Sequence, residues 1–178
     1  MDQELIELVE QAKVGKKWAF GKLYGLFYQR IYRFIYYLTY DKQLSEDLTQ
    51  NTFLKAWRAL PNFSTAKGTF QSFLFTIARN LVIDVKRKNK EFYLDENIDI
   101  SSKEDLEDEY QRQESKQVIA KALEGLEPEE KQIVILRYFE ELSFAEIARV
   151  INKKEGALRV RIHRILIKLK EQLEKNGS

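Results

Sequence analysis

The chain is 178 residues long, 44% of its residues are hydrophobic, 33% are charged, and its formal net charge is +2. It has no cysteine and one histidine, which excludes a disulfide framework or thiolate metal site and removes most routes to nucleophilic catalysis. No apolar stretch approaches the roughly 18 residues that a membrane-spanning helix needs, and phosphate-binding glycine motifs are absent. We therefore expect a cytoplasmic protein that is not an enzyme and has no metal, no cofactor and no small-molecule substrate.

The charge is divided among three segments. Residues 1–90 hold 15 Lys and Arg against 8 Asp and Glu, residues 91–114 hold 2 against 10, and residues 115–178 hold 13 against 10. Two basic segments separated by an acidic one are typical of two domains that bind a polyanion and a linker that does not. This division predicts domains at 1–90 and 115–178, joined by a flexible acidic linker at 91–114.

Helical spacing dominates the first domain. A short amphipathic helix is expected over residues 5–12. From Trp18 to Tyr40, apolar residues recur every three or four positions, and 10 of these 23 residues are aromatic. The rings favour an aromatic-rich core, because aromatic side chains bury large areas in small domains. A further face, with Tyr28, Tyr32 and Tyr36, is a candidate surface for a partner.

Two more helices complete this domain. Ser45 is expected to cap a helix that ends before Pro61. The polar and basic segment 62–69 predicts a loop, and a helix is expected to follow it over residues 70–88. Like charge then dominates residues 91–114, where we expect an extended or weakly helical chain.

The second domain is predicted to contain four helices. The first covers about 118–126, and the second begins at Pro128, a residue that suits an opening turn, and runs to about 139. A capping box from Ser143 to Glu146 starts the third helix. The fourth is expected over residues 155–173.

Residues 144–163 match the helix-turn-helix pattern. Asn152 takes the turn position because Asn tolerates a left-handed backbone, and Leu158 is the apolar residue that docks the second helix. Only a docked helix presents its outer face rigidly to the major groove of DNA. The polar side chains expected on that face are Arg159, Arg161, His163, Arg164 and Lys168. Arginine suits this place because its guanidinium matches the acceptors of guanine, although a solvated basic face would have the same composition.

Four segments together resemble the extracytoplasmic-function (ECF) subfamily of sigma-70-type RNA polymerase sigma factors. Residues 126–148 and 156–164 resemble that family's C-terminal promoter-binding domain. Residues 46–57 resemble its core-polymerase-binding helix, and residues 70–80, with Asp84 and Arg87, resemble the helix that reads the −10 element. The resemblance covers nearly the whole chain in the right order. It implies an all-α fold of two small helical domains, the C-terminal one a four-helix helix-turn-helix.

The resemblance also assigns roles to particular residues. Those that correspond to positions contacting the clamp helices of the large polymerase subunit are Asp47, Gln50 and Asn51. Those assigned to −10 DNA, where flipped bases of the non-template strand are captured, are Phe63, Ser64, Lys67, Phe73, Asn80 and Arg87. Those assigned to −35 DNA are Arg159, Val160, Arg161, His163, Arg164 and Lys168.

The function implied is that of an alternative sigma factor. It would bind core RNA polymerase, recognise the −35 and −10 elements of promoter DNA, initiate transcription, and be controlled by an anti-sigma factor. The acidic segment 91–114 is either a nucleic-acid mimic that threads a polymerase channel or a solubilising tether.

Two other interpretations of the protein's function stay open. One is an ordinary helix-turn-helix regulator, but residues 1–90 show no strand–helix alternation of the kind expected for a receiver-like sensor domain. The other is a helical interaction protein that never binds DNA, which salt-sensitive DNA binding would exclude. Dependence of DNA binding on core polymerase distinguishes a sigma factor from a regulator.

Overall fold

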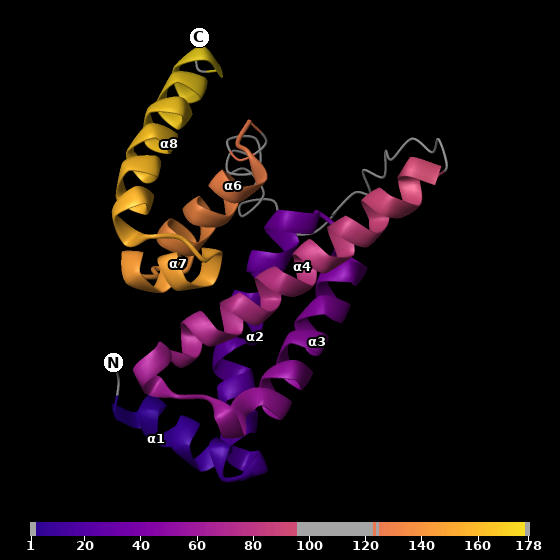
Figure 1. Cartoon of the computed structure of the whole chain (residues 1–178), viewed down its shortest axis with the longest axis vertical. Coiled ribbons are helices and arrows are strands. Elements are labelled where there is room, and N and C mark those ends of the chain that lie inside the picture. The colour runs from indigo at the N-terminus through magenta and orange to yellow at the C-terminus, as the bar shows by residue number, and fades with distance from the viewer. Residues whose placement is uncertain (1–2, 96–122, 124, 177–178) are drawn as a thin grey trace, which may run out of the picture.

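The computed structural model describes residues 3–95, 123 and 125–176, with side chains described for 3–88, 123 and 125–171. Over these residues every regular element is a helix, which confirms the all-α prediction. The N-terminal helices pack together, and the C-terminal helices lie against one side of them (Figure 1). The linker beyond residue 95 and most of the helix expected at 118–126 lie outside the described residues.

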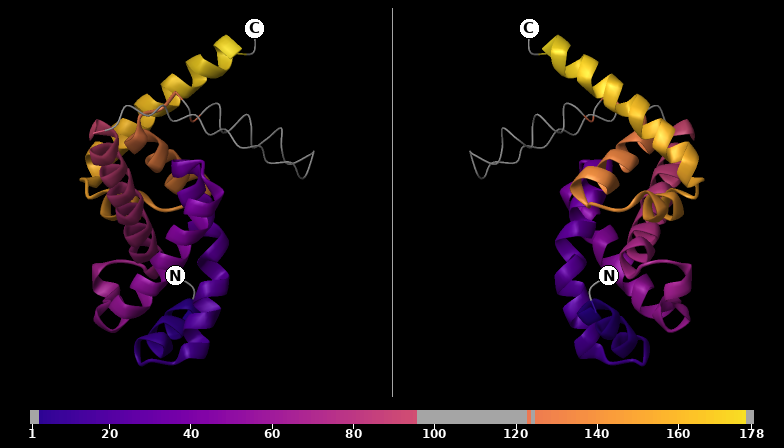
Figure 2. Two further views of the ribbon diagram at one scale, coloured as in Figure 1. Left: turned by 90° about the vertical axis from the view of Figure 1, so that its right-hand side faces the viewer. Right: turned by 90° about the vertical axis from the view of Figure 1, so that its left-hand side faces the viewer.

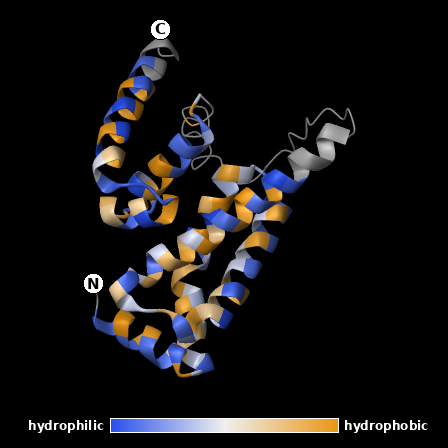
Figure 3. Ribbon diagram, viewed as in Figure 1, coloured by the Kyte–Doolittle hydropathy of each residue, from blue (hydrophilic) through white to orange (hydrophobic). Residues whose placement is uncertain are grey.

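Four helices build the N-terminal half: α1 (Gln3–Lys13), α2 (Lys17–Thr39), α3 (Lys42–Ala59) and α4 (Phe70–Asp95). Helix α2 contacts each of the other three, and apolar residues line the surfaces between them (Figure 3). Phe34 of α2 and Phe75 of α4 are fully buried, with their rings edge to face at a centroid distance of 5.2 Å. The aromatic-rich core expected from the composition is confirmed.

The start of α3 and the end of α4 differ from the sequence-based expectation. Asp41, not Ser45, caps α3, because its side chain accepts a hydrogen bond of 2.9 Å from the backbone N–H of Leu44. Ser45 is buried inside the first turn, with its hydroxyl 2.9 Å from that of Thr39. Helix α4 continues seven residues past its expected end, to Asp95, because the intervening residues include neither Gly nor Pro.

The segment between α3 and α4 is a loop, as the sequence predicted. It contains two single 3₁₀ turns, η1 (Leu60–Asn62) and η2 (Thr65–Lys67). Gly68 follows with a φ of 152°, and a Cβ atom there would lie 2.9 Å from the Ser72 hydroxyl. Glycine, which has no Cβ atom, is therefore required for the backbone at residue 68 to lie this close to the Ser72 side chain.

The described part of the C-terminal half consists of α6 (Pro128–Val134), a π-helical turn η3 (Ile135–Phe139), α7 (Phe144–Ile151) and α8 (Glu155–Asn176). Pro128 opens α6, the Ser143–Glu146 capping box opens α7, and Asn152 adopts the left-handed conformation, as the sequence predicted. The helix expected over 128–139 is regular only to Val134, since the π-helical turn replaces its second half. The far end of α8 projects away from the other described helices (Figure 2).

Candidate nucleic-acid and polymerase interface

A polar stripe runs along the outer side of α3. Asp47, Gln50 and Asn51 are all exposed, and their spacing of three and four residues places them on one face of the helix. Leu54, one turn further on, is 55% exposed and extends the stripe. Sequence reasoning did not single out Leu54, because an isolated leucine in an amphipathic helix is usually buried. The stripe therefore combines hydrogen-bonding groups with one apolar contact.

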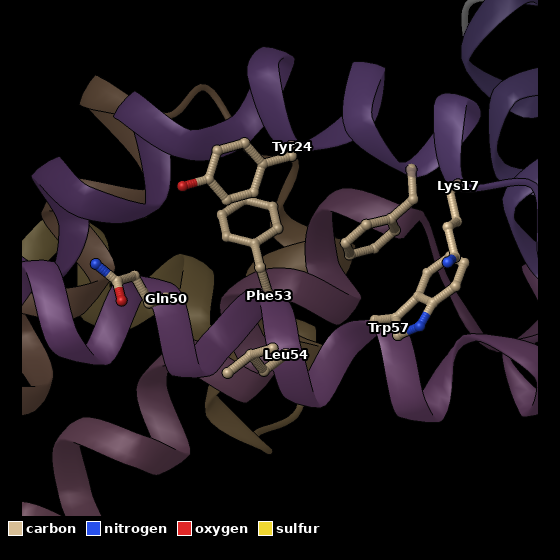
Figure 4. A pocket seen from close by; sticks show the side chains of 7 residues that line it. Lys17, Tyr24, Gln50, Phe53, Leu54 and Trp57 are labelled. Carbon is tan, nitrogen blue, oxygen red and sulfur yellow. The ribbon is translucent and has the colours of Figure 1, made fainter.

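An apolar groove opens beside this stripe, between α2 and α3 (Figure 4). Its volume is about 490 Å³, and the residues that line it are Lys17, Phe20, Tyr24, Gln50, Phe53, Leu54 and Trp57. The rings of Tyr24 and Phe53 are 4.6 Å apart and form part of its wall. Gln50 and Leu54 belong to both the stripe and the groove, so a partner that binds the stripe also reaches the groove.

Three tyrosines continue along the outer side of α2. The rings of Tyr28 and Tyr32 are stacked at 6.4 Å, and those of Tyr32 and Tyr36 at 6.1 Å. Burial raises the pKa of Tyr36 above its ordinary value. All three are half-buried, so they belong partly to the core and partly to the surface.

Four of the six residues assigned to −10 DNA meet at one cavity. It has a volume of about 320 Å³ and lies at the loop between α3 and α4, where its lining includes Phe63, Ser64, Lys67 and Phe73. The Phe63 and Phe73 rings pack against each other at 5.0 Å. Arg149 of α7, from the C-terminal half, also lines this cavity, and nothing in the sequence indicated that contact.

The other two residues assigned to −10 DNA extend this site along α4. Asn80 and Arg87 follow Phe73 at intervals of seven residues, so all three lie on one side of the helix. Asn80 and Arg87 are exposed, and Arg87 lies 3.6 Å from the carboxylate of Asp84. Both side chains are therefore accessible from solvent on the same side of α4 as Phe73.

The two helices of the helix-turn-helix pack through the residues that the sequence predicted. Leu158 is 2% exposed and anchors α8 against the core of the C-terminal half. Ala148 of α7 is buried and leaves room for close packing. On the outer side of α8, Val160 is 55% exposed and His163 and Arg164 are exposed. These three side chains are available to a ligand on that side.

Arg159 is placed differently from Arg164. Its guanidinium lies 4.4 Å from the centre of the Phe144 ring and donates a hydrogen bond of 2.6 Å to Glu155. Its side chain is still 59% exposed. Arg159 therefore contacts both Phe144 and Glu155 while more than half of its side chain stays exposed.

Two further cations of α8 pair with carboxylates of α6. Arg161 donates a hydrogen bond of 2.6 Å to Glu129, and Lys168 donates one of 2.8 Å to Glu130. Burial raises the pKa of Glu130, but hydrogen bonds from Lys168 and from the Glu127 backbone lower it more, and the net shift is downward. Both cations thus fix α8 on α6, a role that their place in the sequence did not reveal.

None of the helices in the described ranges is long and apolar enough to cross a membrane.

Comparison with known proteins gives consistent matches in both halves. Residues 23–92 match the family model "Sigma-70 region 2", and residues 116–169 match "Sigma-70, region 4". The ECF RNA polymerase sigma factor BldN of Streptomyces coelicolor is 39% identical over 87% of this chain, which spans 60% of the length of that relative. The RNA polymerase sigma-H factor of Pseudomonas aeruginosa is 30% identical over 92% of this chain and 89% of its own length.

A solved structure agrees with these relatives. The sigma factor RpoE of Bartonella quintana, in complex with the anti-sigma factor NepR, matches with a TM-score of 0.76 and 25% identity, covering 87% of this chain and 96% of that one. Sequence and fold thus lead to one family. The chain belongs to the extracytoplasmic-function subfamily of sigma-70-type RNA polymerase sigma factors.

Proposed function

We propose that this protein is an alternative sigma factor that binds core RNA polymerase, recognises −35 and −10 promoter elements and initiates transcription. The observation that carries this proposal is the presence of both sigma-70 regions in one chain, in order, each with an exposed candidate interface. Sigma factors are transcription initiation factors rather than enzymes, which agrees with the expectation of no catalytic activity.

The N-terminal half, residues 1–90, is proposed to bind polymerase through the stripe on α3. Asp47, Gln50 and Asn51 offer side-chain hydrogen bonds, and the neighbouring apolar groove offers a seat for an apolar side chain. Interfaces commonly combine an apolar centre with a polar rim. The same half is proposed to capture bases of the −10 element in the cavity lined by Phe63 and Phe73. Stacking of an unpaired base on such rings contributes about 1–3 kcal/mol.

The C-terminal half, residues 115–178, is proposed to read the −35 element with α8. The exposed Arg164 fits the paired acceptors of guanine, and the exposed Val160 fits the methyl group of thymine. Lys168 and Arg161 are already paired with carboxylates. We therefore assign them to orienting α8 and to phosphate contact at its edge. Residues 91–114 are proposed to be the linker between the two DNA-reading domains.

An anti-sigma factor and a cytoplasmic location complete the proposal. The structural relative RpoE is described in complex with the anti-sigma factor NepR, which supports a protein inhibitor of the same class for this chain. A cytoplasmic location follows from the proposed binding of polymerase and promoter DNA.

Reconstituted transcription tests the proposal. Core RNA polymerase is combined with the purified chain and with genomic fragments, and run-off transcripts are sequenced at their 5′ ends. We expect transcript starts downstream of a shared pair of elements, and only when both proteins are present. Tight sequence-specific binding of duplex DNA by the free chain, without stimulation of transcription, would support a conventional regulator instead.

A further inference from the structure

Two arginines lie over one aromatic ring of the helix-turn-helix. Phe144, the first residue of α7, is half-buried at the place where α7 packs against α8 (Figure 1). The guanidinium of Arg159 on α8 lies 4.4 Å from the centre of its ring, and that of Arg137 in η3 lies 4.7 Å from it. The face of an aromatic ring carries a negative potential that attracts a cation. The ring thus joins α7, α8 and η3.

The start of α7 and Arg137 both support this ring. The backbone N–H of Ser143 donates a hydrogen bond of 2.9 Å to the Glu146 carboxylate, and the backbone N–H of Glu146 donates one of 3.3 Å to the Ser143 hydroxyl. Arg137 donates a hydrogen bond of 2.9 Å to the carbonyl oxygen of Leu142, which is fully buried. Phe144 itself packs against the hydrophobic core. All of these residues belong to the C-terminal half, so the support is part of the helix-turn-helix itself.

Contact with the ring leaves the hydrogen-bonding groups of Arg159 available. A guanidinium has five N–H donors in one plane, and the attraction between its charge and a ring uses none of them. Glu155 accepts one hydrogen bond of 2.6 Å, from Nη2 of Arg159. The Arg159 side chain is 59% exposed. A bidentate contact with guanine needs two N–H donors, so Arg159 can contact the ring and a base at the same time.

Arg164 provides a comparison on the same helix. It is exposed, and it borders a hollow between α6 and α8 together with Val160 and Lys168. Among the residues that the structure describes, no aromatic ring lies beneath its guanidinium. Arg164 and Arg159 are therefore both candidates for base contact, but only Arg159 already has a contact with a ring in the free protein.

We propose that Phe144 is a positioning residue for promoter recognition, whose ring orients the Arg159 guanidinium toward one base pair of the −35 element. The inference rests on the proposed reading of that element by α8. Binding orders a long side chain at a cost in conformational entropy, and a contact already made in the free protein reduces that cost. Only the matching base receives the bidentate contact, so the gain in affinity applies to that base and not to the others.

Holoenzyme transcription from a library of randomised −35 elements tests this role. Arg159→Ala first identifies the base pair at which Arg159 sets the preference. Phe144→Leu keeps an apolar side chain but removes the ring, and should reduce the preference at that base pair about two- to fivefold, as expected for an exposed cation–π contact. The preference at the base pair affected by Arg164→Ala should stay as in the wild type. Phe144→Tyr keeps a ring and should keep the wild-type preference at both base pairs.

A double variant separates positioning from a loss of stability. Phe144 packs against the core, so Phe144→Leu should also lower stability and total transcription. A preference is a ratio between templates transcribed by one protein, and it does not depend on how much of that protein is folded. In the Arg159→Ala background, Phe144→Leu should therefore cause no further change in preference. A further reduction of the same size would overturn the positioning role, because the ring would then act without Arg159.

Side-chain dynamics of the free chain provide a second measurement. The order parameter of an arginine Nε–H group, obtained from ¹⁵N relaxation, reports motion of the guanidinium on the picosecond to nanosecond timescale. We expect a higher order parameter for Arg159 than for Arg164 in the wild type. In Phe144→Leu the value for Arg159 should fall toward that of Arg164, and the value for Arg164 should not change. The same order parameter for Arg159 in both proteins would show that the ring does not restrict it, which would overturn the inference.

The transcription results distinguish this inference from the proposed function. If Phe144→Leu leaves the preference at the Arg159 base pair unchanged, the positioning role is wrong and the reading of the −35 element by α8 stands. The same conclusion follows if Arg159→Ala keeps every wild-type preference while Arg164→Ala loses one. If the wild-type holoenzyme prefers no upstream sequence over another, the proposed −35 function is rejected, and the inference with it.

Discussion

The guanidinium of Arg161 on α8 donates a hydrogen bond of 2.6 Å to the carboxylate of Glu129 on α6. Arg164, three residues further along, is exposed. Two arginines that look equivalent in the sequence therefore differ in their surroundings. Arg161 joins α8 to α6, and Arg164 is exposed to solvent.

This difference predicts opposite effects of two alanine substitutions. Arg164→Ala should remove about 1–3 kcal/mol of discrimination at one base pair of the −35 element and leave stability unchanged. Arg161→Ala should lower the free energy of unfolding by about 0.2–1 kcal/mol, because its ion pair with Glu129 is only partly buried. It should weaken transcription from all −35 sequences alike. Holoenzyme transcription from a library of randomised −35 elements, with thermal unfolding in parallel, measures both effects. Wild-type base preference in Arg164→Ala would contradict the assignment.

The stripe on α3 predicts a loss of polymerase affinity without a loss of fold. Gln50→Ala and Leu54→Ala should each weaken binding to core polymerase, since both side chains are exposed and border the apolar groove. Truncation of such surface residues changes stability by less than about 0.5 kcal/mol. Lys42→Ala, exposed on the same helix outside the stripe, is the matched control. Fluorescence titration with core polymerase measures the affinities, and equal values for all four proteins would exclude the stripe as the contact.

Anchoring of α8 predicts a difference between two leucines of that helix. Leu158 is 2% exposed and Leu166 is 42% exposed. Leu158→Ala should therefore lower the free energy of unfolding of the C-terminal half by about 2–5 kcal/mol, and transcription should fall because the helix is no longer docked. Leu166→Ala should have a much smaller effect on stability. Urea unfolding followed by hydrogen exchange in residues 125–171 locates the loss. A similar loss in both variants would mean that Leu158 does not anchor the helix.

The contact between Glu146 and Thr69 predicts a dependence on pH. Burial raises the pKa of Glu146, but hydrogen bonds from Thr69 and Ser143 outweigh this effect and lower the pKa below its ordinary value of 4.5. The stability contributed by Glu146 is therefore fully present above pH 4.5 and is lost as the pH falls through the lowered value in the folded state.

Glu146→Gln provides the comparison for this effect. The difference in unfolding free energy between wild type and Glu146→Gln should shrink as the pH is lowered from 6 to 3, which urea titrations at several pH values measure. Glu130 has a pKa shifted in the same direction, so the variant keeps part of the acid sensitivity. A constant difference over this range would mean that the ionised form of Glu146 is not the stabilising one.

Local features of the fold were determined by the sequence alone. The helical period of residues 18–40, the capping box at Ser143 and the left-handed turn at Asn152 each depend on neighbouring residues, and each appears where it was expected. The family resemblance likewise came from residues read in order. The sequence did not decide between two nearby residues that could both cap the same helix. Asp41, and not Ser45, caps α3.

Only the tertiary structure decided how distant residues pair. Arg161 and Glu129 are 32 residues apart, and Arg30 and Glu140 are 110 apart. No spacing rule links such residues, because their meeting depends on how whole helices pack and not on the period of one helix. For the same reason the sequence did not show that Leu54 would be exposed or that Arg149 would reach the loop at Gly68. Charges on a helix are visible in a sequence, but which of them remain available to a ligand is determined by the surfaces that pack against them.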